Sequence, residues 1–142
     1  MPIWKKSVGQ TVRIGVLLFD QFSNHCLANA VEPLRAANDL SGEILFEWEF
    51  LSLARSSTIS SSGMEISTRG RLYQHSGDML FVIPSYEFRM HSDVLSRAGL
   101  RMAAQRYTAI VGFDTGAWLM AAAELLKGRR ATIHWEELEA FA

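Results

Sequence analysis

The residue best placed to do chemistry in this sequence is Asp114, which lies between a predicted strand and a predicted helix. The run from Thr108 to Val111 is β-branched and apolar, as expected for a buried parallel strand. A Gly-Phe-Asp-Thr-Gly turn follows, and the alanine- and leucine-rich residues 117–126 then predict a helix. Because open α/β sheets bind ligands at the carboxyl ends of their strands, we expect Asp114 to lie at a binding crevice.

The chemistry open to Asp114 is that of a carboxylate, which is ionised at neutral pH but attacks amides poorly. It can hydrogen-bond or ion-pair with a cationic or amine-bearing ligand. It can also cap the helix that follows, which is worth about 1 kcal/mol. The neighbouring Thr115 makes capping the favoured structural interpretation. Capping and ligand contact are compatible with each other.

Aromatic residues near the same strand ends extend the candidate site. Trp118 lies one turn into the helix, while Tyr86 and Trp135 follow predicted strands. Their rings would attract a cationic head group through cation–π interactions, although packing against the sheet is the simpler interpretation for Trp118. His134 could donate a hydrogen bond to Asp114 or to a ligand, or could be a structural histidine at a strand end.

The composition excludes several other classes of protein. The 142 residues have a net charge of −1, which predicts no general attraction to nucleic acid or anionic membranes. The single cysteine, Cys26, excludes an internal disulfide and fits a reducing compartment. The sequence contains no phosphate-binding glycine loop and no cluster of metal ligands, so we expect neither a cofactor nor a metal. We expect a soluble, cytoplasmic domain with no membrane partner.

The other elements follow from apolar spacing. Gly99 is expected to break or soften its helix, Pro33 to bend its own, and Lys127 with Gly128 to cap the helix after Asp114. We also expect the first strand to pair with the strand of Asp114. Besides that strand, the predicted segments are strands at 12–19, 46–53, 78–83 and 130–134, a β-ribbon at 56–68, and helices at 24–42, 94–106, 116–126 and from 135 onward.

Strands that alternate with helices predict an α/β fold, a doubly wound and mostly parallel sheet with helices on both faces. The length fits one domain over residues 1–142. The apolar spacing is still in progress at Ala142, so we expect the domain to be truncated at its C-terminal end.

The turn at residues 112–116, the elbow between the predicted strand and helix, belongs to a set of segments similar to those of a known family. The matching segments are 22–23, 32–38, 82–86, 112–117 and 125–135, of which residues 112–135 are the most specific. On these segments the sequence resembles the amino-terminal DJ-1/PfpI domain of AraC-family transcriptional regulators, whose fold is flavodoxin-like and related to class I glutamine amidotransferases. Within that family it most resembles the regulators of arginine, glycine betaine and carnitine catabolism.

The resemblance implies a particular comparison of site residues. Enzymes of the superfamily carry a cysteine nucleophile at the elbow, a histidine on the next strand and an acid on the first helix. Here these positions hold Asp114, His134 and Cys26. Two of the three chemical groups are changed, so the resemblance implies ligand sensing without catalysis.

The function implied is that of an effector-sensing and dimerising domain. A small amine, amino acid or quaternary ammonium compound would bind at the crevice, and DNA would be bound only by a helix-turn-helix domain outside this chain. One alternative is a DJ-1/PfpI-type amidase, peptidase or glyoxalase-like enzyme. Another is a fold kept only for dimerisation, with an empty crevice.

Overall fold

Four parallel strands form the central layer of the protein, in the order β2-β1-β5-β6, and a separate antiparallel ribbon is formed by β3 and β4. The computed structural model describes residues 9–142. The α/β prediction is confirmed. In chain order the elements are β1 (Val12–Leu18), α1 (Asn24–Ser41), β2 (Phe46–Leu51), β3 (Ser57–Ile59), β4 (Glu65–Ser67), η1 (Leu72–Gln74), β5 (Gly77–Ile83), α2 (Val94–Ala103), β6 (Tyr107–Gly112), α3 (Gly116–Ala122), η2 (Trp135–Glu137) and α4 (Leu138–Phe141).

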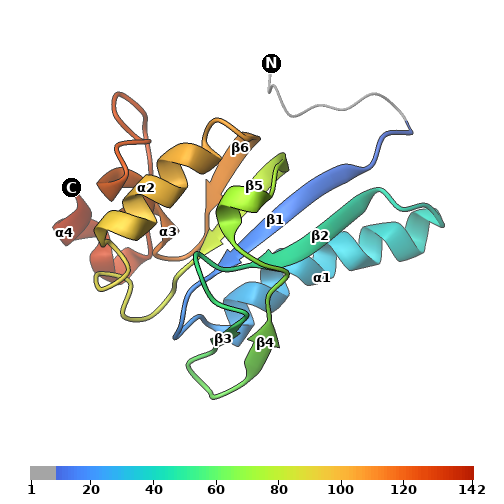
Figure 1. Cartoon of the computed structure of the whole chain (residues 1–142), viewed down its shortest axis with the longest axis horizontal. Helices are drawn as coiled ribbons and strands as arrows, with labels where there is room; N and C mark the ends of the chain where they lie inside the picture. The colour runs from blue at the N-terminus through green and yellow to red at the C-terminus, as the bar shows by residue number, and fades with distance from the viewer. Residues whose placement is uncertain (1–8) are drawn as a thin grey trace.

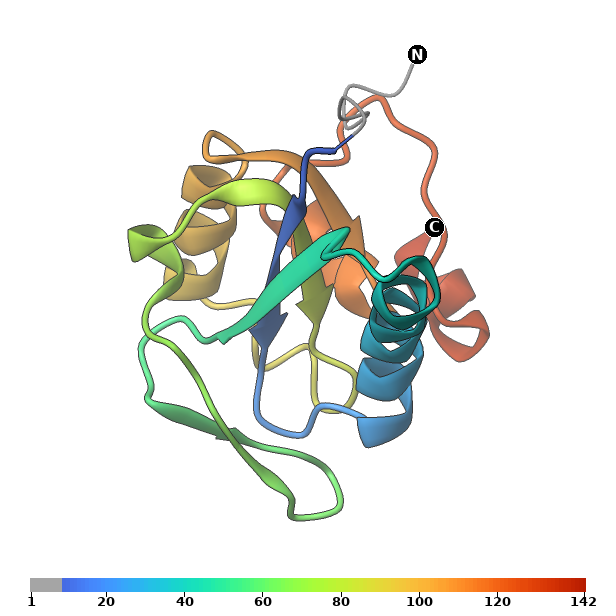
Figure 2. The same ribbon diagram turned by 90° about the vertical axis from the view of Figure 1, so that its right-hand side faces the viewer.

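Helices cover both faces of the sheet, with α1 on one side and α2 on the other (Figures 1 and 2). Alternate residues of β1 point to opposite faces, as strand geometry requires. Val16 and Leu18 therefore join the core beneath α1, whereas Leu17 joins the core that Leu100 of α2 and Leu119 of α3 complete. Within the described residues, no helix is long and apolar enough to cross a membrane.

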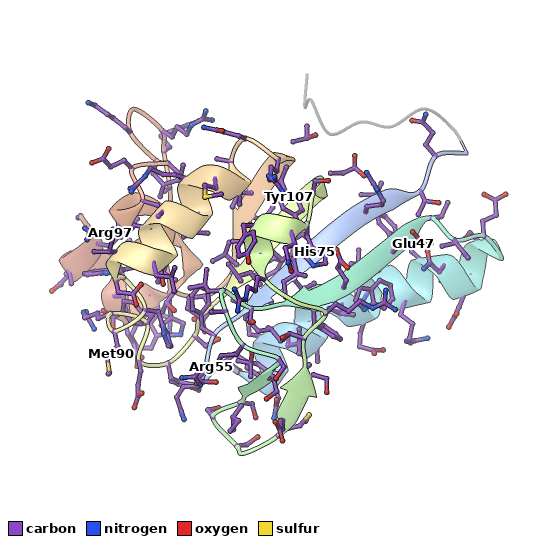
Figure 3. All side chains as sticks on the ribbon, viewed as in Figure 1. Glu47, Arg55, His75, Met90, Arg97 and Tyr107 are labelled. Carbon is purple, nitrogen blue, oxygen red and sulfur yellow. The ribbon has the colours of Figure 1, made fainter. Side chains whose placement is uncertain are left out.

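The expected pairing of β1 with β6 was wrong, because β5 lies between them. The two strands meet instead through the Tyr107 side chain. Its ring passes over Gly77 of β5, and its hydroxyl reaches Gly15 of β1, where an added Cβ would lie only 2.6 Å from the Tyr107 Oη. Figure 3 shows Tyr107 at this end of the sheet with His75. Glycine at both positions is what admits the ring.

Helix α1 begins and ends where its sequence predicts. The Ser23 Oγ accepts a hydrogen bond from the Cys26 backbone N–H at 3.2 Å, and Gly42 ends the helix with φ 69°. Pro33 lies inside the helix without ending it. The helix thereby places Cys26 in its first turn, next to the carboxyl end of β1.

The outer edge of β2 is closed by groups from outside the sheet. Asn38 of α1 donates from its Nδ2 to the Phe46 carbonyl at 2.8 Å and accepts from the Phe46 N–H at 2.9 Å. Further along, the Arg69 N–H donates to the Phe50 carbonyl at 2.7 Å. These bonds use the backbone groups with which a further strand would pair.

Two details of the helices on the other face differ from expectation. Helix α2 runs through Gly99 without a break, and the missing side chain there admits Leu53, whose Cδ2 would lie 3.0 Å from an added Cβ. Helix α3 ends at Ala122, so the prediction that Lys127 and Gly128 cap it was wrong.

The early end of α3 has a clear physical cause. Glu124 adopts a left-handed conformation with φ 64°, and its N–H donates to the Ala121 carbonyl at 2.8 Å. The Leu125 N–H donates to the Met120 carbonyl at 2.9 Å. This pair of bonds is a Schellman motif, and the packing of Leu125 against the core stabilises it.

The strand predicted at 130–134 is absent from the structure, and that prediction was wrong. Although β6 is the edge strand of the sheet, the described residues of this segment form no ladder with it. The segment buries Ile133, and the His134 N–H donates to the Asp114 carbonyl at 3.1 Å. The helical start predicted at Trp135 is confirmed by η2 and α4.

Candidate functional site

The elbow between β6 and α3 holds Asp114 in a left-handed backbone conformation with φ 56°. Its carboxylate does not cap the helix: the N-cap residue is Thr115, which makes no side-chain cap bond. The Thr115 Oγ1 instead donates to the Ser85 carbonyl at 2.7 Å, which ties α3 to the end of β5. The capping interpretation was therefore wrong. Among residues 9–142 the Asp114 side chain has no hydrogen-bond or ion-pair partner.

A cavity of about 530 Å³ opens in front of Asp114. Its wall combines the elbow, the loop after β5 and the segment after Ile133. The lining residues are Ser85, Tyr86, Glu87, Phe88, Arg89, Met90, Asp114, Thr115, His134, Glu136 and Glu137. Four carboxylates against one guanidinium give the lining a net charge of −3 with histidine neutral. The cavity therefore favours cationic ligands.

Several cavity residues hold unusual backbone conformations. Ser85 and Glu87, like Asp114, have positive φ angles, at 51° and 52°. Gln21, at the carboxyl end of β1, has φ 69°. Non-glycine residues rarely adopt this conformation, and such residues gather at functional sites. Their presence at the ends of three neighbouring strands makes this edge of the sheet the candidate site.

Arg89 is held by aromatic rings and by an ion pair. Its Cζ lies 4.7 Å from the centre of the Phe88 ring and 4.8 Å from that of the Trp118 ring. Its guanidinium donates to both carboxylate oxygens of Glu137, with Nη1 at 3.5 Å and Nη2 closer. The loop after β5 is thereby joined to η2 across the cavity.

Cys26 lies beside the elbow, as the comparison with the superfamily enzymes implies, but it does not line the cavity. The pKa of Cys26 is raised from 9.0 to about 11, first by burial and then by the nearby Asp114 charge, with the Ser85 hydroxyl partly offsetting these two effects. The Ser85 Oγ is buried without a hydrogen-bond partner of ordinary geometry in the described part of the chain. Cys26 is thus a protonated, weakly reactive thiol at neutral pH.

The raised pKa of Cys26 makes a direct prediction about its reactivity. Alkylation of the folded chain by iodoacetamide is expected to remain slow at pH 8 and to accelerate toward pH 11, because only the thiolate reacts. The urea-unfolded chain is expected to show the ordinary thiol profile, about two pH units lower. Mass spectrometry of the single thiol gives both profiles. Coincident profiles would contradict the burial of Cys26 beside Asp114.

The predicted site residues fall into two groups. Tyr86, Asp114, Thr115 and His134 line the cavity. Cys26, Trp118 and Trp135 lie outside its lining. Trp118 packs edge-on against Phe88 at 5.3 Å, and Trp135 is 75% exposed with its ring 5.8 Å from that of His134. The His134 side chain contacts Glu136 at 3.8 Å rather than the Asp114 carboxylate.

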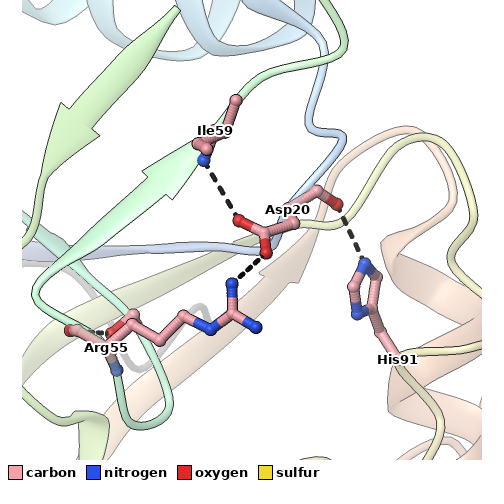
Figure 4. Close-up of polar contacts among 5 residues, drawn as sticks. Asp20, Arg55, Ile59 and His91 are labelled. Carbon is pink, nitrogen blue, oxygen red and sulfur yellow. Dashed lines mark hydrogen bonds and ion pairs between the residues drawn. The ribbon is translucent and has the colours of Figure 1, made fainter. Parts of the chain in front are cut away.

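Sequence reasoning identified Tyr86 but missed the rest of the loop after β5, and it missed the two glutamates of η2, because neither segment has a periodic pattern. It also missed Asp20, at the carboxyl end of β1 (Figure 4). The Asp20 carboxylate accepts from the Ile59 N–H at 3.1 Å and pairs with Arg55, while its carbonyl accepts from the His91 Nε2 at 2.9 Å. Asp20 thereby connects the ribbon to the loop that lines the cavity. A polar residue directly after a buried strand was the available signal.

A larger hollow of about 700 Å³ lies along β2 at the amino ends of the strands. Its charged lining residues are Arg13, Glu47, Glu49 and Arg69, which balance one another. Its lining has no net charge and lacks the unusual backbone conformations of the elbow, so the elbow cavity is the stronger candidate.

Comparison with known proteins finds similarity to transcriptional regulators. No family model matches the chain. It is 39% identical over 127 residues to the HTH-type transcriptional regulator CdhR of Pseudomonas aeruginosa, covering 88% of this chain and 37% of that protein. It is 36% identical over 130 residues to the HTH-type transcriptional regulator GlxA of Rhizobium meliloti, covering 90% of this chain and 40% of that protein. The chain thus spans well under half the length of these relatives.

Solved structures show the same fold. An AraC family transcriptional regulator from Pseudomonas putida matches with a TM-score of 0.70 and 23% identity, over 92% of this chain and 70% of that one. A ThiJ/PfpI family protein from Pseudomonas syringae matches with a TM-score of 0.73 and 19% identity, over 93% and 55%. The chain is therefore similar over most of its length to part of two HTH-type transcriptional regulators, and it shares its fold with an AraC family regulator and a ThiJ/PfpI family protein, which confirms the predicted resemblance.

Proposed function

We propose that this chain is the effector-sensing domain of a transcriptional regulator and binds a small cationic metabolite at the elbow cavity without catalysis. The observation that carries the proposal is the carboxylate of Asp114, which lies unpaired in an acidic cavity. An amine, a basic amino acid or a quaternary ammonium compound would supply the missing positive charge. The relatives with transcription-regulator names support the regulatory role.

The chemistry of the elbow argues against the enzyme alternative. A cysteine nucleophile acts as a thiolate of lowered pKa, and the elbow position here is a carboxylate. The nearby Cys26 has a pKa raised to about 11, so it does not replace that nucleophile. Binding without turnover is the chemistry that the cavity residues support best.

Effector binding would act on DNA by a shift between two arrangements of a dimer. Such a shift requires that the effector bind the two arrangements with different affinities. The homodimer, and a DNA-binding domain outside this chain, are parts of the proposal. His134, Glu136 and Glu137 line the cavity, so the segment that carries them is placed to respond to an occupant.

Calorimetric titration of the chain with choline, arginine and glycine betaine tests the proposal. At least one cation is expected to bind, and more weakly as salt rises, because the Debye length falls from about 30 Å at 0.01 M to about 3 Å at 1 M. The control is the neutral carbon isostere of choline, dimethylbutanol, which should bind far more weakly. Equal binding of choline and its isostere, or no binding by any cation, would contradict the proposal.

A further inference from the structure

The surroundings of Arg89 have the form of a binding site for an organic cation. The Phe88 and Trp118 rings meet edge-to-face, with centres 5.3 Å apart and planes at 70°. The Arg89 Cζ lies over both rings, and the Glu137 carboxylate closes the third side. Two aromatic faces with one carboxylate are the groups with which proteins bind guanidinium and ammonium ions. In this structure the guanidinium of Arg89 occupies that site.

We infer that Arg89 is a built-in competitor for the cation subsite of the elbow cavity, and that a cationic effector binds by exchange with it. The inference rests on the proposed function. It narrows the effector class to guanidinium compounds, which match both the charge and the flat surface that Arg89 presents to Phe88 and Trp118, and to compact ammonium compounds, which match the charge.

The Arg89 side chain is more exposed to solvent than the side chains that it contacts. The Arg89 side chain is 53% exposed, whereas the Glu137 side chain is 22% exposed and Phe88 is 5% exposed. Trp118 is partly buried against the core and is fixed on α3. The partners are therefore held in place when the arginine leaves, and the long arginine side chain can extend into solvent from its loop.

Exchange would also change what holds the segment after the cavity. The pair with Arg89 joins Glu137 of η2 to the loop after β5, residues 48 positions apart in the sequence. Phe141 of α4 lies 6.3 Å from the Trp118 ring, centre to centre. An effector that takes the place of Arg89 therefore acts on η2 and α4 through Glu137 and Trp118.

Calorimetry of the whole chain with methylguanidinium and choline tests the exchange. Arg89→Gln removes the competitor and is expected to tighten binding of at least one of these cations about tenfold. A charge change alone would have a smaller effect, and Arg97→Gln on α2 is the matched control, expected to change affinity less than about twofold. Figure 3 shows Arg97 on that helix.

Arg89→Lys distinguishes an effect of exchange on affinity from an effect of the net charge of the cavity. Lysine keeps the positive charge but loses the planar stack and the two-point pairing with Glu137. Exchange predicts about threefold tighter binding for this variant, whereas a purely electrostatic effect predicts no change. This variant also serves if Arg89→Gln fails to fold, which thermal unfolding would reveal.

The outcomes distinguish this inference from the proposed function. If the wild-type chain binds a cation and both Arg89 variants bind it equally or more weakly, the exchange is overturned while the sensing role stands. If neither the wild type nor any variant binds a cation, the sensing role itself is overturned. Tighter binding by both Arg89 variants, with Arg97→Gln unchanged, supports the exchange.

Discussion

Replacing Asp114 by asparagine is expected to weaken cation binding at the elbow cavity about tenfold or more and to leave the fold intact. Asp114 has no charged partner among the described residues, so the ligand would supply its only ion pair, and hydrogen bonds to charged groups contribute about 1.5–3 kcal/mol. Asparagine suits the test because, like aspartate, it tolerates the left-handed backbone at φ 56°. Titration calorimetry at low salt measures the loss.

The control for Asp114→Asn is Glu65→Gln, which removes the same charge from the exposed ribbon strand β4. It is expected to leave the affinity unchanged within about twofold. A second readout needs no ligand: since the Asp114 charge raises the pKa of Cys26, Asp114→Asn should move the alkylation profile of Cys26 to lower pH. Unchanged affinity together with the shifted thiol profile would show that the carboxylate is present at the elbow but does not bind the ligand.

The largest effect on stability is expected from Gly116→Ala, at about 3 kcal/mol of lost unfolding free energy or more. An added Cβ at Gly116 would lie 2.5 Å from the Val82 carbonyl oxygen, a backbone atom that cannot move without disturbing β5. Gly116 begins α3 directly after the elbow, so the contact also fixes how closely the helix approaches the sheet. Urea unfolding followed by circular dichroism measures the change.

Gly99→Ala in α2 is the matched control for Gly116→Ala. Its added Cβ would lie 3.0 Å from the Leu53 Cδ2, the flexible end of a side chain, and alanine favours the helix by about 1 kcal/mol over glycine. The two effects oppose each other, so the unfolding free energy should change by less than about 1 kcal/mol. Equal losses for the two variants would contradict the close approach of Gly116 to β5.

The fold could be predicted where a continuous apolar run in the sequence indicates a buried strand, as in β1 and β5. The end of α3 was not predictable, because the left-handed residue that terminates it is Glu124 rather than a glycine. The sequence places its glycine at position 128, whereas the helix ends earlier, where the partly buried Leu125 packs against the core, a tertiary contact. Residues 130–134 have strand-forming side chains, but the segment is held by the burial of Ile133 and by the backbone bond from His134 to Asp114 rather than by pairing with the edge strand β6.

The cavity residues at the elbow could be predicted from the sequence, whereas those of the loop after β5 and of η2 that form the Arg89–Glu137 pair could not. Asp114 and Thr115 follow a recognisable strand, and Tyr86 and His134 lie near predicted strand ends, so topology alone brings them together. Arg89 and Glu137 carry no such signal. Their pairing depends on how the loop after β5 and η2 pack over the Trp118 ring, which no periodic pattern in either segment records.

The side-chain amide of Asn38 makes the edge of β2 sensitive to deamidation. Asn38 satisfies both backbone groups of Phe46, which requires an oxygen and an NH₂ group on the same side chain. Hydrolysis of that amide to aspartate, a slow and spontaneous form of protein ageing, would place a carboxylate oxygen against the Phe46 carbonyl. The aged chain would lose this bond, expose the start of β2 to strands of other molecules, and so become more prone to aggregate.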